Sequence, residues 1–190
     1  MKYVIGGFGI IIIVAAFIAI IVAFVGRDPI HNDIDPDEII TELSDFADDS
    51  SEVSFTTYGP IVGHEEFKAI RITVNDSHRR LDILRGYDLA VDERIEIANT
   101  AAAYEAFLYA LEEANFTATL DGQEAREDGK CPTNRRHVYR LEIDDEERLR
   151  TWSSPCRGQR GNFGGEARLV ERLFQGQIPD YRDITREVRL

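Results

Sequence analysis

Two cysteines, Cys131 and Cys156, are the residues of this chain best suited to covalent chemistry. In an oxidising compartment a single pair is typical of one structural disulfide, whereas in the cytosol both would remain free thiols. A free Cys131 together with His137 would combine a thiol nucleophile with a base. We favour the disulfide, because a bond to Cys156 would consume that thiol.

Other patterns that could do chemistry fail at a required position. His64-Glu65-Glu66 begins like the H-E-x-x-H motif of zinc metalloproteases, but Lys68 stands where the second histidine belongs. The C-x-x-C and H-x-x-x-H spacings of zinc sites do not occur, and neither does the G-x-S-x-G motif of serine hydrolases. We therefore predict no catalytic residue, no cofactor site and no metal site, and favour a protein that is not an enzyme.

Residues 130–160 are rich in basic side chains and could contact an anion or an acidic partner. The candidates are Arg135, Arg136, Arg157 and Arg160. A glycine-rich stretch at 158–165 precedes a predicted helix, whose first N–H groups would attract an anion, although the stretch lacks the G-K-[ST] of a phosphate loop. The alternative is that the basic side chains pair with acidic residues across neighbouring strands.

The whole chain is acidic, with 22 Lys and Arg against 35 Asp and Glu and a net charge of −13. Such a charge argues against binding nucleic acid and against adhesion to an anionic lipid surface by bulk electrostatics. We therefore expect no nucleic-acid partner. For the basic segment the expected partner is a protein or an anionic wall polymer.

The most apolar part of the chain is residues 3–25, which contain no charged side chain. As a helix rising ~1.5 Å per residue, this segment is long enough to cross the ~30 Å hydrocarbon core of a bilayer. It is longer than the apolar region of a cleaved signal peptide, and no A-x-A cleavage site follows it. The pattern predicts an uncleaved transmembrane signal anchor over residues 1–26.

The predicted anchor also indicates where the protein is located and how its copies could form a homo-oligomer. Ala15, Ala19 and Ala23 recur every four residues and would form a smooth ridge on which two transmembrane helices could pack into a homo-oligomer. Lys2 and Arg27 flank the span almost symmetrically, so the expected disulfide decides the orientation. We predict a single-pass protein of the cell membrane, with the N-terminus cytoplasmic and the C-terminal domain extracytoplasmic.

The rest of the chain divides into three parts. Residues 27–52 form an acidic juxtamembrane linker, residues 53–181 an extracytoplasmic domain, and residues 182–190 a charged tail. Alternation of apolar and polar residues predicts strands, and apolar residues three or four apart predict helices. The expected strands are 53–57, 67–74, 80–86, 91–97, 137–143 and 148–153, and the expected helices are 101–114 and 166–175.

These elements predict an α+β fold in which one antiparallel meander sheet of about six strands is covered by two helices and pinned by one disulfide. Asn99 or Thr100 would cap the first helix and Asn115 would end it. In the last hairpin, a turn over 144–147 would place Tyr139 opposite Trp152. Cys131 and Cys156 would then lie at the open end of that hairpin, where closing a loop of about 25 residues stabilises the fold by roughly 3 kcal/mol.

The C-terminal third of the chain, with the helix AYEAFLYAL at 103–111, resembles uncharacterised single-pass, membrane-anchored exported proteins of reduced-genome candidate-phylum bacteria. The residues that carry the resemblance are Cys131-Pro132, Tyr139, Trp152-Ser153, Cys156, Asn162-Phe163-Gly164-Gly165, Leu173-Phe174 and Gln177-Ile178-Pro179-Asp180-Tyr181. It implies a placement and a fold but no activity. Gly7-Phe8 also resembles the processing site of type IV pilins, but Ile12 replaces their glutamate and Pro29 interrupts the helix.

Taken together, the sequence favours a membrane-tethered extracytoplasmic interaction domain or envelope accessory without enzymatic activity. One alternative is a subunit of a pilin-like surface filament or secretion assembly, which would pack through the apolar helix. A second alternative is an envelope hydrolase, which would require a pocket with convergent polar groups.

Overall fold

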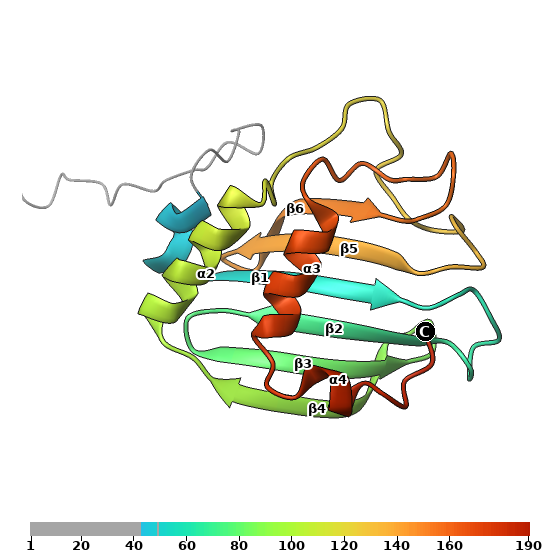
Figure 1. The fold of residues 1–190 in the computed structure, drawn as a ribbon, viewed down its shortest axis with the longest axis horizontal. Coiled ribbons are helices and arrows are strands. Elements are labelled where there is room, and N and C mark those ends of the chain that lie inside the picture. Colours follow the sequence, from blue (N-terminus) through green and yellow to red (C-terminus); the bar gives the residue numbers. More distant parts are fainter. Residues whose placement is uncertain (1–42, 49) are drawn as a thin grey trace, which may run out of the picture. The chain divides into compact units, whose positions relative to one another are not determined.

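Alternating apolar and polar residues form strands where the sequence predicts them. The computed structural model describes residues 43–48 and 50–190 (Figure 1). In this part of the chain each expected strand is present, and its ends differ from the expected ones by at most two residues. The strands are β1 (Ser51–Tyr58), β2 (Lys68–Val74), β3 (His78–Arg85), β4 (Ala90–Ala98), β5 (Arg136–Ile143) and β6 (Glu146–Ser153).

All six strands belong to one antiparallel sheet with the order β4-β3-β2-β1-β5-β6. The first four strands form a meander, with a loop at 59–67 between β1 and β2 and shorter turns after β2 and β3. The chain then passes through α2 (Ala101–Glu113) and a long loop before β5 pairs with β1, so the sheet is a meander extended by a hairpin (Figure 1). The predicted α+β class, the six antiparallel strands, the two covering helices and the single disulfide are confirmed for the described residues.

Helix α2 begins and ends at the predicted residues. The Thr100 hydroxyl accepts a hydrogen bond from the Ala103 N–H at 3.3 Å, which caps the first turn. At the other end Asn115 adopts a left-handed conformation with φ of 55°. The Asn115 N–H then bonds to the Glu112 carbonyl and the Phe116 N–H to the Leu111 carbonyl, the two bonds of a Schellman motif.

The second helix, α3 (Ala167–Gly176), packs on the face of the sheet that carries Phe55 (Figure 1). Its Phe174 ring is stacked on Phe55 at 5.6 Å between centroids and meets Phe107 of α2 edge-on at 5.1 Å. Phe174 is fully buried, so this one side chain joins both helices to the central strand of the sheet. The predicted aromatic face of α2 is therefore part of the core.

Two glycines in the loop before α3 are required by close packing. Gly161 has φ of +84°, and a Cβ built on it would lie 2.1 Å from the Trp152 carbonyl oxygen. A Cβ on Gly165 would lie 2.2 Å from the Asn115 carbonyl oxygen. Since no side chain larger than hydrogen fits at either position, the glycine-rich stretch serves to bring β6 and the end of α2 together.

Residues on both sides of the predicted domain boundaries take part in the fold. The segment predicted as a linker contains the 3₁₀ helix η1 (Leu43–Asp48), whose Leu43 and Ala47 are buried, and also the first residues of β1. At the other end α4 (Tyr181–Ile184) overlaps the start of the predicted tail. Leu190 lies beside Gly59, at the end of β1.

The predicted anchor at 1–26, with Ala15, Ala19 and Ala23, lies outside the described residues. Within residues 43–48 and 50–190, no helix is long and apolar enough to cross a bilayer.

The register predicted for the β5–β6 hairpin is wrong by one residue. Tyr139 lies opposite Thr151, and Trp152 pairs with Val138 on the other face of the sheet. The cause is a two-residue turn, Asp144-Asp145, with φ of 52° and 63°, followed by a bulge between Leu141 and Glu142. Because side chains alternate between faces, this shift moves the tryptophan away from the helices and onto the open face.

Truncation of Phe174 tests its role in the core. We expect Phe174→Ala to lower the free energy of unfolding by about 3–5 kcal/mol, because it leaves a cavity where both helices meet the sheet. Urea unfolding followed by circular dichroism measures this change. Tyr109→Ala, on the exposed side of α2 where the ring is 58% exposed, should change it by less than about 0.5 kcal/mol. Equal losses in the two variants would contradict this description of the core.

Candidate functional site

The face of the sheet opposite α2 and α3 is covered by charged side chains. Register places Arg94, Asp82, Arg71 and Thr56 opposite one another on β4, β3, β2 and β1. Thr56 is buried although neither α2 nor α3 of the described residues packs on this face. The aliphatic stems of the neighbouring arginines explain this burial, because such stems lie along a surface while the guanidinium group stays near water.

Asp82 is the centre of the charged network. Its carboxylate is fully buried and accepts hydrogen bonds from Arg94 at 2.6 Å and 3.2 Å and from Arg71 at 3.2 Å. The Arg80 Nε lies 3.6 Å from the same carboxylate. Burial by itself would raise the pKa of Asp82, but the hydrogen bonds from Arg94 and Arg71 outweigh it and hold the pKa below its ordinary value. Asp82 is therefore an ion-paired carboxylate and not a proton donor.

The loop at 121–130 packs against β6 through two polar contacts. The Trp152 indole N–H donates to the Glu124 carbonyl at 2.7 Å. Arg150 donates to Glu127 at 2.5 Å, and both of these side chains are largely buried. This loop carries no periodic pattern in the sequence, and only its tertiary contacts order it over the sheet. It brings the Glu127 carboxylate to the open face.

A cavity of about 430 Å³ lies where this loop meets the loops that follow β1 and β3. Its aromatic walls are a run of three rings: Tyr58 and Phe67 lie 6.1 Å apart, and Phe67 and Tyr87 lie 4.3 Å apart with nearly parallel planes. Tyr87 is held at the mouth, because its hydroxyl donates to the Val62 carbonyl at 2.7 Å and accepts from the Val62 N–H at 3.2 Å. We name this cavity, lined by Tyr58, Phe67, Tyr87, Glu127, Arg136 and Arg150 among others, the aromatic pocket.

Arg136 forms the inner wall of the aromatic pocket. Its guanidinium donates to the Gly59 carbonyl at 2.7 Å and lies over the Tyr58 ring, 5.8 Å from the centroid. The residue is 5% exposed, and burial lowers the pKa of Arg136 from its ordinary value, an effect that Glu127 partly offsets. An arginine remains charged after such a shift, so the pocket contains a buried cation beside an aromatic ring.

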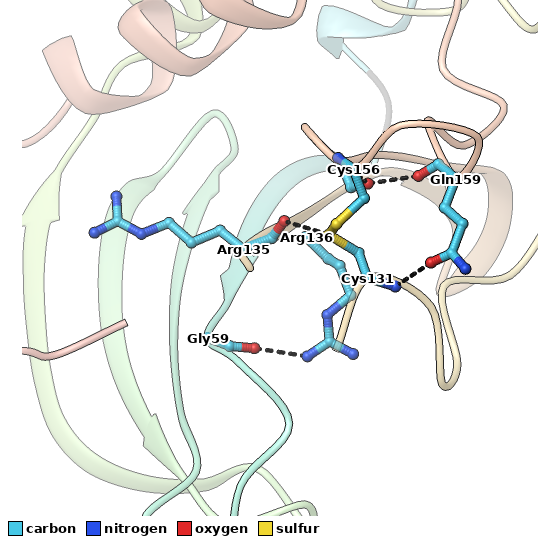
Figure 2. The surroundings of a disulfide bond; sticks show 7 residues. Gly59, Cys131, Arg135, Arg136, Cys156 and Gln159 are labelled. Atoms are coloured by element: carbon cyan, nitrogen blue, oxygen red, sulfur yellow. Dashed lines mark hydrogen bonds between the residues drawn. A yellow bond between two sulfur atoms is a disulfide. The ribbon is translucent and has the colours of Figure 1, made fainter. Parts of the chain in front are cut away.

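The disulfide between Cys131 and Cys156 is confirmed, with an S–S distance of 2.02 Å (Figure 2). Figure 2 shows the Cys131 N–H donating to the Gln159 side chain, at 2.5 Å. The residue after the bridge, Pro132, accepts a hydrogen bond from the Ile61 N–H at 2.7 Å. Since Ile61 lines the aromatic pocket, the disulfide loop supports one of its walls.

The structure separates the four arginines proposed for partner contact. Arg136 is buried, whereas Arg135, Arg157 and Arg160 are exposed. Figure 2 shows the Arg135 and Arg136 side chains pointing in different directions, with Arg135 just before the start of β5. Other basic residues of the segment pair with acids: Arg140 with Glu147, Arg148 with Glu146, Arg150 with Glu127 and Lys130 with Glu124.

The other candidates for chemistry have structural partners. His137 Nδ1 lies 3.2 Å from the Thr57 hydroxyl, its ring stacks on Phe55, and burial lowers the pKa of His137. His64 accepts from the Tyr87 N–H at 3.3 Å and lies 3.6 Å from Asp88. Across residues 43–48 and 50–190, no group of three or more His, Cys, Asp or Glu side chains is arranged to hold a metal ion.

The aromatic pocket is not predicted by any pattern in the sequence. Its walls come from four separated segments, near residues 58–67, 87–89, 127–129 and 136–150, and no motif links them. The available signal was a pair of aromatic residues at the base of one predicted hairpin, Phe67 just before β2 and Tyr87 just after β3.

Comparison with models of protein families and comparison with curated proteins find no match to this chain.

Removing the disulfide tests its support of the aromatic pocket. We expect Cys131→Ser with Cys156→Ser to lower the free energy of unfolding by about 3 kcal/mol, because the closed loop constrains the unfolded chain. The Ile61 amide should also exchange hydrogen faster than the global loss predicts. The control is the Asn75 amide, which bonds to the His78 carbonyl in a turn after β2. An equal acceleration at both amides would contradict a local role.

Replacing Asp82 tests the charged network. We expect Asp82→Asn to lower the free energy of unfolding at pH 7 by about 3 kcal/mol, because the arginines around it lose their buried counter-charge. The folded-state pKa of Asp82 is depressed, so its contribution is present above pH 4 and is lost as the pH falls through the folded value. Urea titrations should show the two proteins converging in acid. The control, Asp92→Asn, removes an exposed partner of Arg85 and should cost under about 1 kcal/mol.

Proposed function

We propose that this chain is a membrane-tethered extracytoplasmic binding domain, an accessory of the cell envelope that performs no catalysis. The observation that carries the proposal is the disulfide between Cys131 and Cys156, in a chain that also contains the uncharged, largely apolar segment 3–25. Structural disulfides persist in oxidising compartments and are rare in the cytosol. An outward-facing domain behind an uncleaved anchor satisfies both features.

The titratable groups of the folded part support binding over catalysis. Three groups with perturbed pKa values are engaged in the core or in ion pairs: Asp82 with arginines, Tyr104 with Ser51, and Tyr139 with Ser153. Burial raises the pKa of both tyrosines, which makes them poor acids and bases near neutral pH. The aromatic pocket offers instead a surface of rings and fixed charges, the usual composition of a recognition site.

Labelling of thiols in intact cells tests the proposal. We expect a membrane-impermeant maleimide to label the chain only after treatment with an impermeant reductant, because Cys131 and Cys156 are then a disulfide outside the membrane. Mass spectrometry of the labelled chain measures the outcome, and Cys156, which is partly exposed, should react first. Labelling that needs lysis but no reductant would place free thiols in the cytosol and overturn the proposal.

A cysteine placed on the surface separates topology from disulfide formation. In the background of Cys131→Ser and Cys156→Ser, Tyr109→Cys provides an exposed thiol on α2, and we expect it to be labelled in intact cells. Lys2→Cys in the same background is the matched control at the other end of the predicted span. It should be labelled only after lysis, and the reverse pattern would show the opposite orientation.

A further inference from the structure

The aromatic pocket is lined by aromatic rings and by charged side chains, and one ligand must complement both. The first is the run of rings Tyr58, Phe67 and Tyr87, of which Tyr87 is 47% exposed and held at the mouth by its hydrogen bonds to Val62. An exposed ring fixed in place offers a flat, weakly negative face. Such a face stacks on a flat group that carries C–H bonds or positive partial charge.

The second lining is a balanced set of charges. Glu127 and Asp128 carry negative charge and Arg136 and Arg150 carry positive charge, so the charges that line the pocket sum to zero. The two carboxylates would repel a strongly anionic ligand, and the two guanidinium groups would repel a strongly cationic ligand. The lining therefore favours a ligand without net charge.

Three buried side-chain atoms of this lining, Glu127 Oε2, Arg136 Nε and Arg150 Nε, have no hydrogen-bond partner among the described residues. Glu127 is 5% exposed, and its Oε1 accepts from Arg150 while its Oε2 has no hydrogen-bond partner among the described residues. Arg136 is also 5% exposed and donates through Nη2 to Gly59, while its Nε has no partner among those residues. Arginine Nε atoms without a partner also occur away from the pocket, at Arg71 and Arg79, so the atom that points to a ligand is the Glu127 Oε2. Buried polar groups are nearly always paired, and a buried carboxylate oxygen without a donor favours a ligand with hydroxyl groups.

We propose that the aromatic pocket binds a neutral sugar ring, with the ring's C–H face on Tyr87 and its hydroxyl groups toward Glu127 and Arg136. A hydroxyl group can donate to a carboxylate and accept from a guanidinium, and a pyranose ring presents both hydroxyl groups and an apolar face. A cavity of about 430 Å³ has the size of a small-molecule site. This inference rests on the proposed binding function, for which it supplies the class of ligand.

Saturation-transfer NMR on the full chain in lipid nanodiscs tests the inference. The probes are three neutral sugars, N,N′-diacetylchitobiose, maltotriose and mannobiose, compared with glucuronic acid and glucosamine as charged analogues. We expect transfer from the protein to the ring protons of at least one neutral sugar and weaker transfer to both charged ones. Absence of transfer to all three neutral sugars, or stronger transfer to a charged one, would overturn the inference.

Variants at the mouth and wall of the pocket locate the binding. Tyr87→Ala should weaken the best neutral sugar about tenfold, since it removes the stacking face. Tyr87→Leu keeps an apolar side chain on Phe67 but also removes the stacking face, so it should weaken binding to a similar extent. This variant replaces the alanine variant if that one unfolds. Glu127→Gln should weaken binding, while Tyr109→Ala, which removes a ring on the exposed side of α2, should leave it unchanged. Unchanged binding in both Tyr87 variants would place the sugar elsewhere and overturn the inference.

The sugar inference and the proposed function fail in different experiments. Impermeant-maleimide labelling reports the compartment whether or not a sugar binds. A chain labelled outside the cell that shows no transfer to neutral sugars overturns only the ligand class. A chain that binds a neutral sugar through Tyr87 but is labelled only after lysis supports the pocket and overturns the extracytoplasmic location.

Discussion

The pairing of β1 with β5 is the constraint on which the rest of the fold depends. These strands run from Ser51 opposite Ile143 to Tyr58 opposite Arg136, and the contact between Thr57 and His137 joins residues 80 positions apart. Without it the meander β1–β4 and the hairpin β5–β6 would remain separate pieces, each with one uncovered apolar face. Joined, they form one sheet wide enough to bury Phe174 of α3 between Phe55 of β1 and Phe107 of α2.

The same pairing builds the aromatic pocket at one end of the sheet. Tyr58 is the last residue of β1 and Arg136 the first of β5, and their side chains meet because the strands are antiparallel. The disulfide lies next to this point, where the Pro132 carbonyl accepts a hydrogen bond from the Ile61 N–H. The disulfide-closed loop and the β1–β5 pair therefore support neighbouring walls of the aromatic pocket. This support lowers the free-energy cost of keeping open a cavity that is lined by buried charges.

The two faces of the sheet bury different kinds of side chain. Toward the helices, aromatic rings fill the space between Phe55, Phe107 and Phe174. On the open face, buried Asp82 is compensated by three arginines, and Glu127 by Arg150. An acidic chain with a net charge of −13 thus uses much of its basic content internally, on its own sheet. Basic residues close together in the sequence, such as Arg135 and Arg136, consequently do not form one surface.

The sequence by itself determined the strands and helices, because local periodicity expresses them directly. It also determined the ends of α2, through the capping residues Thr100 and Asn115, and the cysteine pair, through the even number of cysteines. It did not determine the hairpin register, since the left-handed Asp144-Asp145 turn and the adjacent bulge depend on packing on both faces. The aromatic pocket was decided only by tertiary structure. Phe67, Tyr87, Glu127 and Arg136 are distant in the chain, and only non-local strand pairing and the ordering of the loop at 121–130 bring them together.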